Sequence, residues 1–169
     1  MLHAIILSYG GIPMIYAGDE IGTLNDYSYL KNKDLKEDNR WANRPKQDWK
    51  TVAGLDKIDT PQTQIFHSLK KLIRIRRNTP VFADINNLLL HPTPNAHIFM
   101  FERRNNSDKD VLVICNFDEK LHMIDTAGVA SKGYVAGGKL KDLVLGESIT
   151  LKSSLLEINP YQILWLSKS

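Results

Sequence analysis

Residues 10–26 read GGIPMIYAGDEIGTLND, and this stretch decides the fold. Two glycines form a turn, residues 12–17 form an apolar run without alternation, and a loop with two adjacent carboxylates, Asp19 and Glu20, follows. A strand that is buried on both faces has this pattern, and such strands belong to parallel sheets that are covered by helices. The sequence therefore predicts a buried parallel strand over residues 12–17.

The segments on either side of this stretch extend the pattern. Residues 2–9 have the composition of the last two turns of a helix that ends at Gly10 and Gly11. Residues 18–59 are polar and irregular, and a loop of this length is uncommon unless it serves a function such as an active site. A second helix is predicted from Thr60, its cap, to about residue 77, because apolar residues recur at helical spacing. This order of elements is typical of the end of an alternating βα fold.

A buried parallel strand needs hydrogen-bonded neighbours, and the sequence before residue 12 offers none. We therefore expect the chain to be a fragment, with the missing strands on other residues. An unpaired strand with apolar side chains recruits other chains or collapses onto nearby apolar surface. The prediction is that residues 1–80 associate with a second copy or repack.

From about residue 85 the sequence changes to short apolar runs between polar turns. Eight runs are strand candidates: residues 86–92, 96–103, 110–117, 121–126, 139–145, 148–151, 155–158 and 161–167. Many short strands between turns favour an antiparallel β-sandwich. Alternation in the second and last runs predicts one inward side for each strand, with Cys115, Phe117 and Trp165 in the core. The expected fold class is α+β, with residues 1–84 as the end of the βα part and residues 85–169 as an all-β domain.

The composition limits the class of protein. With 43% hydrophobic residues, the chain can form a core. The net charge of +3 is too small to indicate a nucleic-acid partner, and the basic run at residues 74–77 fits a solvated helix C-terminus. No apolar run approaches the roughly 18 residues that span a bilayer, and residues 1–13 lack the features of a signal peptide. We therefore expect neither a nucleic-acid nor a membrane partner.

The cysteine and histidine content argues against an internal disulfide and against a metal site. Cys115 is the single cysteine, so no internal disulfide is expected, and a reducing, cytoplasmic location fits best. The five histidines show no metal-ligand spacing, so neither a metal nor a cofactor is expected. Asp19 and Glu20 are not interpreted as a catalytic pair, because adjacent side chains at a strand end point to different sides.

Two motifs in residues 11–45 carry a family resemblance. The pattern GIPMIYAGDE at residues 11–20 resembles the eighth-strand segment of the α-amylase superfamily of (β/α)8 enzymes. The run GTLND at residues 22–26 and the run RWANRP at residues 40–45 narrow the resemblance to amylosucrases and related sucrose hydrolases. The similarity continues through the second helix and the closing run, so it covers essentially the whole chain. It implies the last strand, active-site loop and last helix of a (β/α)8 barrel, followed by a C-terminal β-sandwich.

The resemblance also implies an activity for the parent protein. Amylosucrase-like enzymes take the glucosyl unit of sucrose onto a carboxylate and pass it to an α-glucan or to water. This retaining chemistry needs two carboxyl groups about 5 Å apart. In the family these groups lie on earlier strands, so no catalytic residue is expected in this chain. Sucrose or an α-glucan is the implied partner of the full-length enzyme, and the chain alone should be inactive.

The resemblance assigns a substrate-binding role to one residue. Arg40 matches the arginine at the bottom of the glucosyl pocket, where it pairs with an upstream aspartate and binds hydroxyls of the sugar. The planar guanidinium suits this role, because it serves a carboxylate and a hydroxyl at once. The alternative for Arg40 is a structural ion pair within the loop. The remaining implied residues are structural groups at the barrel mouth, namely Asp19, Glu20 and Arg44.

Some features of this segment leave alternatives open. Tyr27 and Trp41 are candidates for stacking on sugar faces or for the small core of the long loop. Position 43 is Asn where family members carry His, and residues 25–30 replace a more acidic stretch. Both departures lie where acceptor or fructosyl contacts would be made, so the choice between transferase and hydrolase stays open. The alternative to an enzyme segment is a free-standing carbohydrate-binding or structural β-sandwich without catalysis.

Overall fold

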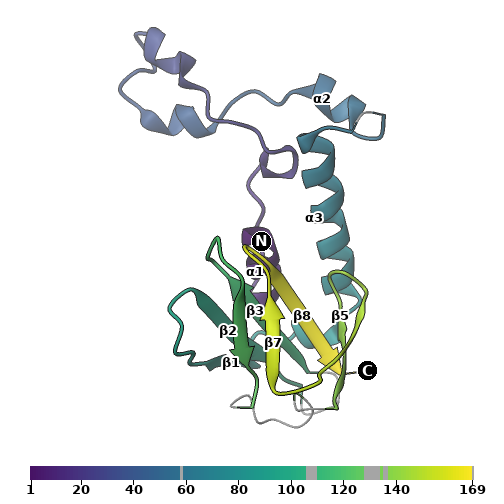
Figure 1. Cartoon of the computed structure of the whole chain (residues 1–169). Helices are drawn as coiled ribbons and strands as arrows, with labels where there is room; N and C mark the ends of the chain where they lie inside the picture. Colours follow the sequence, from purple (N-terminus) through teal and green to yellow (C-terminus); the bar gives the residue numbers. More distant parts are fainter. Residues whose placement is uncertain (58, 106–109, 128–133, 135–136, 169) are drawn as a thin grey trace. The chain divides into compact units, whose positions relative to one another are not determined.

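The computed structural model describes residues 1–57, 59–105, 110–127, 134 and 137–168 (Figure 1). The chain divides into two compact units, one made of Met1–Pro13 with Lys71–Ser169 and the other of Met14–Lys70. The first unit thus joins the N-terminal helix to the β-rich half of the sequence. The domain boundary between residues 84 and 85 stays a prediction.

The first unit contains helix α1, the C-terminal part of helix α3, the 3-10 helix η4 and the strands. The helices are α1 (Leu2–Tyr9), α3 (Pro61–Arg77) and η4 (Pro80–Phe82). The strands are β1 (Leu88–His91), β2 (Ile98–Arg103), β3 (Val111–Asn116), β4 (His122–Asp125), β5 (Lys139–Asp142), β6 (Ser148–Thr150), β7 (Leu155–Ile158) and β8 (Ile163–Lys168). Both predicted helices form, and each of these strands lies on a run that the sequence predicted, to within one residue.

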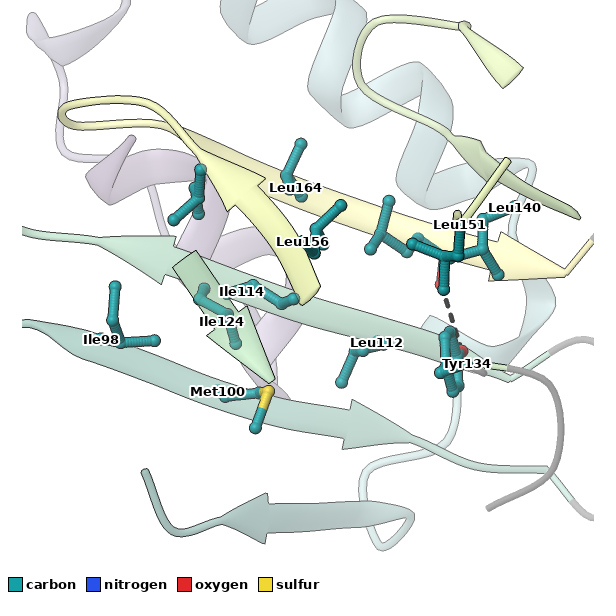
Figure 2. Packing of buried hydrophobic residues seen from close by; sticks show 12 residues of the cluster. Ile98, Met100, Leu112, Ile114, Ile124, Tyr134, Leu140, Leu151, Leu156 and Leu164 are labelled. Atoms are coloured by element: carbon teal, nitrogen blue, oxygen red, sulfur yellow. Dashed lines mark hydrogen bonds between the residues drawn. The ribbon is translucent and has the colours of Figure 1, made fainter. Parts of the chain in front are cut away.

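The strands form two antiparallel sheets that share a core. Six of them pair in the order β1-β2-β3-β8-β5-β6, and β4 pairs with β7 in the second sheet. Met100 lies opposite Ile114, and Ile114 opposite Leu164, so all three side chains share one face of the larger sheet. They pack with Ile124 and Leu156 of the second sheet in a single buried cluster (Figure 2). The predicted α+β class, with a mainly antiparallel sheet, is confirmed.

The other face of the larger sheet is also covered. The ring of Phe82 from η4 lies 5.0 Å from that of Trp165, and the ring of Tyr9 from α1 lies 5.3 Å from that of Phe101, between centroids. Every residue of β3 is therefore buried. The prediction of one inward side for each strand is wrong for β2 and β8, whose runs it rested on, and for β3, because consecutive residues of these central strands are buried under a layer on each face.

The predicted core residues of this unit have different outcomes. Cys115 and Trp165 are fully buried, as predicted. Phe117 is 42% exposed, so its prediction is wrong. The reason is local, since β3 ends at Asn116 and Phe117 begins the following turn, held by a backbone bond from its N–H to the His97 carbonyl.

Two arginines bind the C-terminal carbonyl groups of α1. Arg103, fully buried in β2, donates to the carbonyls of Ser8 and Asp84 and to the side chain of Asn87. Arg76 of α3 donates to the carbonyls of Leu7 and Gly11. The last carbonyls of a helix have no hydrogen-bond partner within the helix, and they lie at the negative end of its dipole. The two arginines therefore supply both hydrogen-bond donors and positive charge at the end of α1. The basic run ends α3 as predicted, but Arg76 binds α1 and is not simply a solvated charge.

The predicted strand at residues 12–17 is not present. No strand is assigned to this segment, which follows α1 as an irregular connection (Figure 1). Ile12 is 89% exposed, Met14 81% and Tyr16 55%. The apolar pattern indicates a strand that is buried between neighbours, and the described residues supply no neighbouring parallel strand. Without partners for its backbone, the segment gains nothing from a β conformation.

The second unit consists of short helices joined by turns. They are η1 (Asp19–Ile21), η2 (Tyr27–Lys31), η3 (Asn39–Asn43), α2 (Trp49–Gly54) and the N-terminal part of α3. Asp26, Asp38 and Asp48 cap η2, η3 and α2, because each carboxylate accepts a backbone N–H of the first turn. Among the described residues of both units, no helix has the length and apolar character needed to cross a membrane.

Candidate functional site

A cavity of about 390 Å³ in the second unit is the candidate site. Two sequence segments enclose it, residues 16–25 and residues 40–45. The lining residues are Tyr16, Ala17, Gly18, Asp19, Thr23, Leu24, Asn25, Arg40, Asn43, Arg44 and Pro45. We refer to this cavity as the Arg40 pocket. It contains the carboxylate of Asp19, two guanidinium groups and two carboxamides, a set of donors and acceptors suited to polyhydroxylated ligands.

The first wall of the Arg40 pocket is a tight turn at Gly18. This residue has φ of 104°, which favours glycine, and a Cβ there would lie 3.0 Å from the side chain of Thr23. The Gly18 N–H donates to Oε2 of Glu20 at 2.7 Å, and the Gly18 carbonyl accepts the Thr23 N–H at 2.9 Å. The carboxylate of Glu20 therefore holds the turn and does not enter the cavity.

The second wall is η3, and it carries the guanidinium of Arg40. Asp38 caps this helix and also binds Arg40 in a bidentate pair, with Nε to Oδ1 and Nη2 to Oδ2 each at 2.8 Å. The hydrogen bond from the Arg40 side chain is the main reason that the pKa of Asp38 falls to about 2. The same bond raises the pKa of Arg40. Both groups thus stay charged across the neutral range, and Nη1 of Arg40 is left for another acceptor.

A backbone hydrogen bond joins the two walls. The N–H of Asp26 donates to the carbonyl of Ala42 at 2.8 Å. Ala42 and Ile21 are the buried apolar residues of this part of the loop. These contacts hold η1 and η3 close enough to enclose the pocket, although their centres are about twenty residues apart in sequence.

The structure brings together some of the residues that the sequence singled out. Asp19, Arg40 and Arg44 line the Arg40 pocket, while Tyr27 and Trp41 do not. Tyr27 is 60% exposed and Trp41 is 38% exposed, so neither forms the core of the loop. That interpretation is wrong, because the buried apolar residues of this unit are Ile21, Ala42, Leu55 and Leu69, and neither aromatic ring is among them. Their role in stacking on sugar rings stays a prediction.

Several lining residues were not singled out in the sequence. Tyr16, Thr23 and Asn25 enter the Arg40 pocket because the chain reverses direction at Gly18. Gly18 and Gly22, which flank Asp19 and Glu20, could have signalled this reversal in the sequence, since glycines mark turns. Both adopt a positive φ in the structure. The Oγ1 atom of Thr23 is buried and has no hydrogen-bond partner among the described residues.

The described residues contain no group of three His, Cys, Asp or Glu side chains placed to hold a metal ion. The Arg40 pocket offers a ligand hydrogen bonds and charge. Arginine and asparagine side chains can donate to hydroxyl oxygens, and Asp19 can accept from hydroxyl groups.

Known proteins are similar to this chain over part of their own length. No protein-family model matches the chain. The glucosylglycerate phosphorylase of Escherichia coli K12 is 26% identical over 167 residues, a match that covers 98% of this chain and 27% of that protein. The chain thus spans about a quarter of the curated relative.

Solved structures match in the same way. A crystal structure of AmyP in complex with maltose matches with a TM-score of 0.71 and 16% identity, covering 98% of this chain and 33% of that one. A MutB mutant in complex with the substrate sucrose matches with a TM-score of 0.64 and 17% identity, covering 99% of this chain and 37% of that one. The chain therefore has the fold of the C-terminal portion of α-amylase superfamily proteins.

Proposed function

We propose that this chain works as the C-terminal part of an α-amylase superfamily enzyme that acts on sucrose or α-glucans. In this proposal residues 18–59 are the active-site loop at the end of a (β/α)8 barrel, and α3 is its last helix. The proposal rests on the motifs in residues 11–45, on the partial match to glucosylglycerate phosphorylase, and on matched structures that contain maltose, maltotriose or sucrose.

The observation that carries the proposal is the placement of Arg40 in a cavity with other polar groups. The guanidinium is oriented by Asp38 at two atoms, and this preorganisation lowers the entropic cost of binding a ligand. Nη1 can then donate to a sugar hydroxyl. A hydrogen bond from a charged donor is stronger than one between neutral groups.

The proposal divides the catalytic roles between this chain and other residues. The nucleophile and the acid of a retaining reaction lie on earlier strands in the family, and they are not assigned to any residue here. Arg40 holds the glucosyl unit, Glu20 and Arg44 fix the geometry of the loop beside it, and Asn43 lies where the acceptor would bind. Whether the acceptor is a sugar, water or another nucleophile is left to the test.

The test compares the chain with a polypeptide that joins it to the upstream barrel strands. The joined polypeptide should release a monosaccharide from sucrose or maltotriose, and the chain alone should not exceed a boiled control. A joined polypeptide that folds but cleaves neither sugar would contradict the proposal. If the chain alone binds maltotriose without cleaving it, a free-standing carbohydrate-binding module would be favoured instead.

A further inference from the structure

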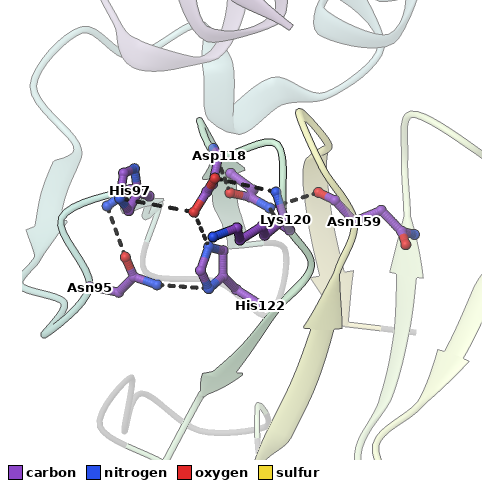
Figure 3. A network of polar contacts seen from close by, with 7 residues as sticks. Asn95, His97, Asp118, Lys120, His122 and Asn159 are labelled. Carbon is purple, nitrogen blue, oxygen red and sulfur yellow. Dashed lines mark hydrogen bonds and ion pairs between the residues drawn. The ribbon is translucent and has the colours of Figure 1, made fainter.

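A polar network joins three connecting segments of the first unit (Figure 3). Its centre is His122, the first residue of β4. Nε2 of this ring lies 2.8 Å from Oδ2 of Asp118 in the turn after β3, and Nδ1 lies 3.0 Å from Nδ2 of Asn95 in the loop between β1 and β2. The side chains of His122 and Asp118 are only 22% and 16% exposed, so the contacts are partly shielded from water.

Asn95 determines which ring nitrogen of His122 carries the proton. Its Oδ1 accepts the backbone N–H of His97 at 2.9 Å, so the amide nitrogen Nδ2 is the atom that faces the ring. An amide nitrogen can only donate, and Nδ1 of His122 must therefore accept and carry no proton. Nε2 then carries the single ring proton and donates it to Asp118.

A second ring proton would have no acceptor in this arrangement. On Nδ1 it would point at the amide hydrogens of Asn95. Asn95 can present Oδ1 to the ring only by rotating, and this rotation breaks its bond to the His97 N–H. Neutral and doubly protonated forms of His122 therefore require two different arrangements of the loop between β1 and β2.

The charged groups around the ring act in opposite directions. The negative charge of Asp118 would attract a second ring proton, and the pKa of Asp118 is lowered chiefly by the hydrogen bond to the His122 ring. His97 opposes a second charge when it is itself protonated, because its ring is stacked on His122 with centroids 6.1 Å apart. The paired strand β7 presents the uncharged Ile158, and Lys120 in the turn is exposed.

Asn116 and Asn159 extend the network but do not titrate. The Asn116 side chain donates to the carbonyls of Lys120 and Asn159 and accepts the N–H of Asp118. These bonds fix the turn that carries Asp118 to the turn before β8. The acceptor of the His122 proton is therefore held in place, and the loop that carries Asn95 is the part free to respond.

We propose that His122 is a pH-sensitive latch, which holds the loop between β1 and β2 against β4 while its ring is neutral and releases it when the ring gains a second proton. Histidine side chains ordinarily titrate between about pH 5 and 8. The loop residues 92–95 and the β4 residues 123–125 line opposite sides of a cavity of about 90 Å³. Release of Asn95 opens this cavity over Ile98 and Met100.

The loop is expected to stay folded when the latch opens. The carbonyl of Asn95 accepts from the Thr93 hydroxyl at 2.9 Å and from the Ile98 N–H at 3.1 Å, and neither bond involves His122. A variant that lacks the Asn95 side chain should therefore remain folded, which makes the latch testable by substitution.

The first measurement uses the unmodified chain labelled with 15N. Imidazole nitrogen shifts at pH 8 should show the proton of His122 on Nε2. On acidification, the backbone N–H signal of His97 should shift, and its hydrogen exchange should accelerate, with the same midpoint as the His122 ring. A proton on Nδ1 at pH 8, or a His97 N–H that does not respond as His122 titrates, would overturn the proposal.

Two variants separate the latch from the titration of His97 itself. His97→Gln keeps the backbone N–H at position 97 and removes the neighbouring ring, so the coupled change should persist. Asn95→Ala should abolish the coupling while the His122 ring still titrates. A coupled response that survives in Asn95→Ala, or disappears in His97→Gln, would contradict the latch.

Discussion

Replacing Arg103 tests the anchoring of α1 most severely. Arg103→Met keeps much of the side-chain volume and removes the hydrogen-bond donors. The carbonyl of Ser8 then loses its partner in a buried site, and the carbonyl of Asp84 and the side chain of Asn87 lose theirs in partly buried sites. Each buried polar group left unsatisfied costs about 1–3 kcal/mol.

The expected loss of unfolding free energy has two opposing contributions. The orphaned acceptors lower the stability, and removal of the buried charge raises it. At about 1–3 kcal/mol for each orphaned acceptor, three acceptors would cost about 3–9 kcal/mol if all were buried, but those of Asp84 and Asn87 are only partly buried, so a loss at the lower end is expected. Burial lowers the pKa of Arg103, which shows that the cation is held at a cost in the folded state, and Met removes this cost. We therefore expect a net loss of about 3 kcal/mol, near the lower end of that range.

Urea unfolding followed by circular dichroism measures this loss. With a slope of about 1–3 kcal/mol per molar urea, the midpoint should fall by about 1–3 M. Arg77→Met is the matched control, because Arg77 is exposed at the end of α3, and its midpoint should not move. A loss below about 1 kcal/mol in Arg103→Met, at an unchanged slope, would refute the role of Arg103 as the anchor of α1.

Three further predictions concern single sites. Burial raises the pKa of the Cys115 thiol to about 12, so a thiol reagent at pH 8 should label it only in urea; rapid labelling of the folded chain would contradict this burial. Burial raises the pKa of Asp142, so the folded state holds that proton more tightly than the unfolded state, and this contribution to stability is lost as pH rises above about 4. Asp142→Asn keeps the acceptor for the Val144 and Trp165 N–H groups. Its urea midpoint should therefore rise relative to that of the parent between pH 4 and pH 7, and a parent midpoint that rises relative to that of the variant would contradict this prediction. Gly22→Ala should lower the melting temperature, because φ is 61° and the new Cβ would lie 2.7 Å from Cδ1 of Ile65, whereas Gly54→Ala, with no atom within 4 Å, should not.

The sequence predicted the β half well because its signals are local. Each strand coincides with an apolar run between turn residues, and such runs need only a neighbouring strand to form. Phe117 was placed wrongly because the end of a strand depends on where its partner ends. In the same way, the burial of β3 on both faces depends on α1 and η4, which lie far away in sequence.

The region around residues 12–17 was predicted less well. Its apolar pattern indicates burial between neighbouring strands, and the segment does not form a strand by itself. The described residues provide no parallel strand beside it. The Arg40 pocket was predicted in part. The motif identified Arg40 and Arg44, and an ion pair of Arg40 within the loop was one of its two interpretations, but the choice of Asp38 as partner depends on the fold of η3.

The central claim is that Arg40 holds a glucosyl unit, and one kinetic comparison tests it most directly. In the polypeptide that joins this chain to the upstream strands, kcat/KM for sucrose should be measured for Arg40→Ala, Arg40→Lys and the control Arg74→Ala. Loss of a charged hydrogen bond worth about 1.5–3 kcal/mol predicts a fall of roughly 10- to 150-fold for Arg40→Ala, while Arg74→Ala keeps full activity. Arg40→Lys should recover little, because an ammonium cannot bind Asp38 at two atoms and a hydroxyl together. Arg40 and Asp38 lie at the surface, so the melting temperature should not change, and a folded Arg40→Ala enzyme with parental kcat/KM would contradict the account.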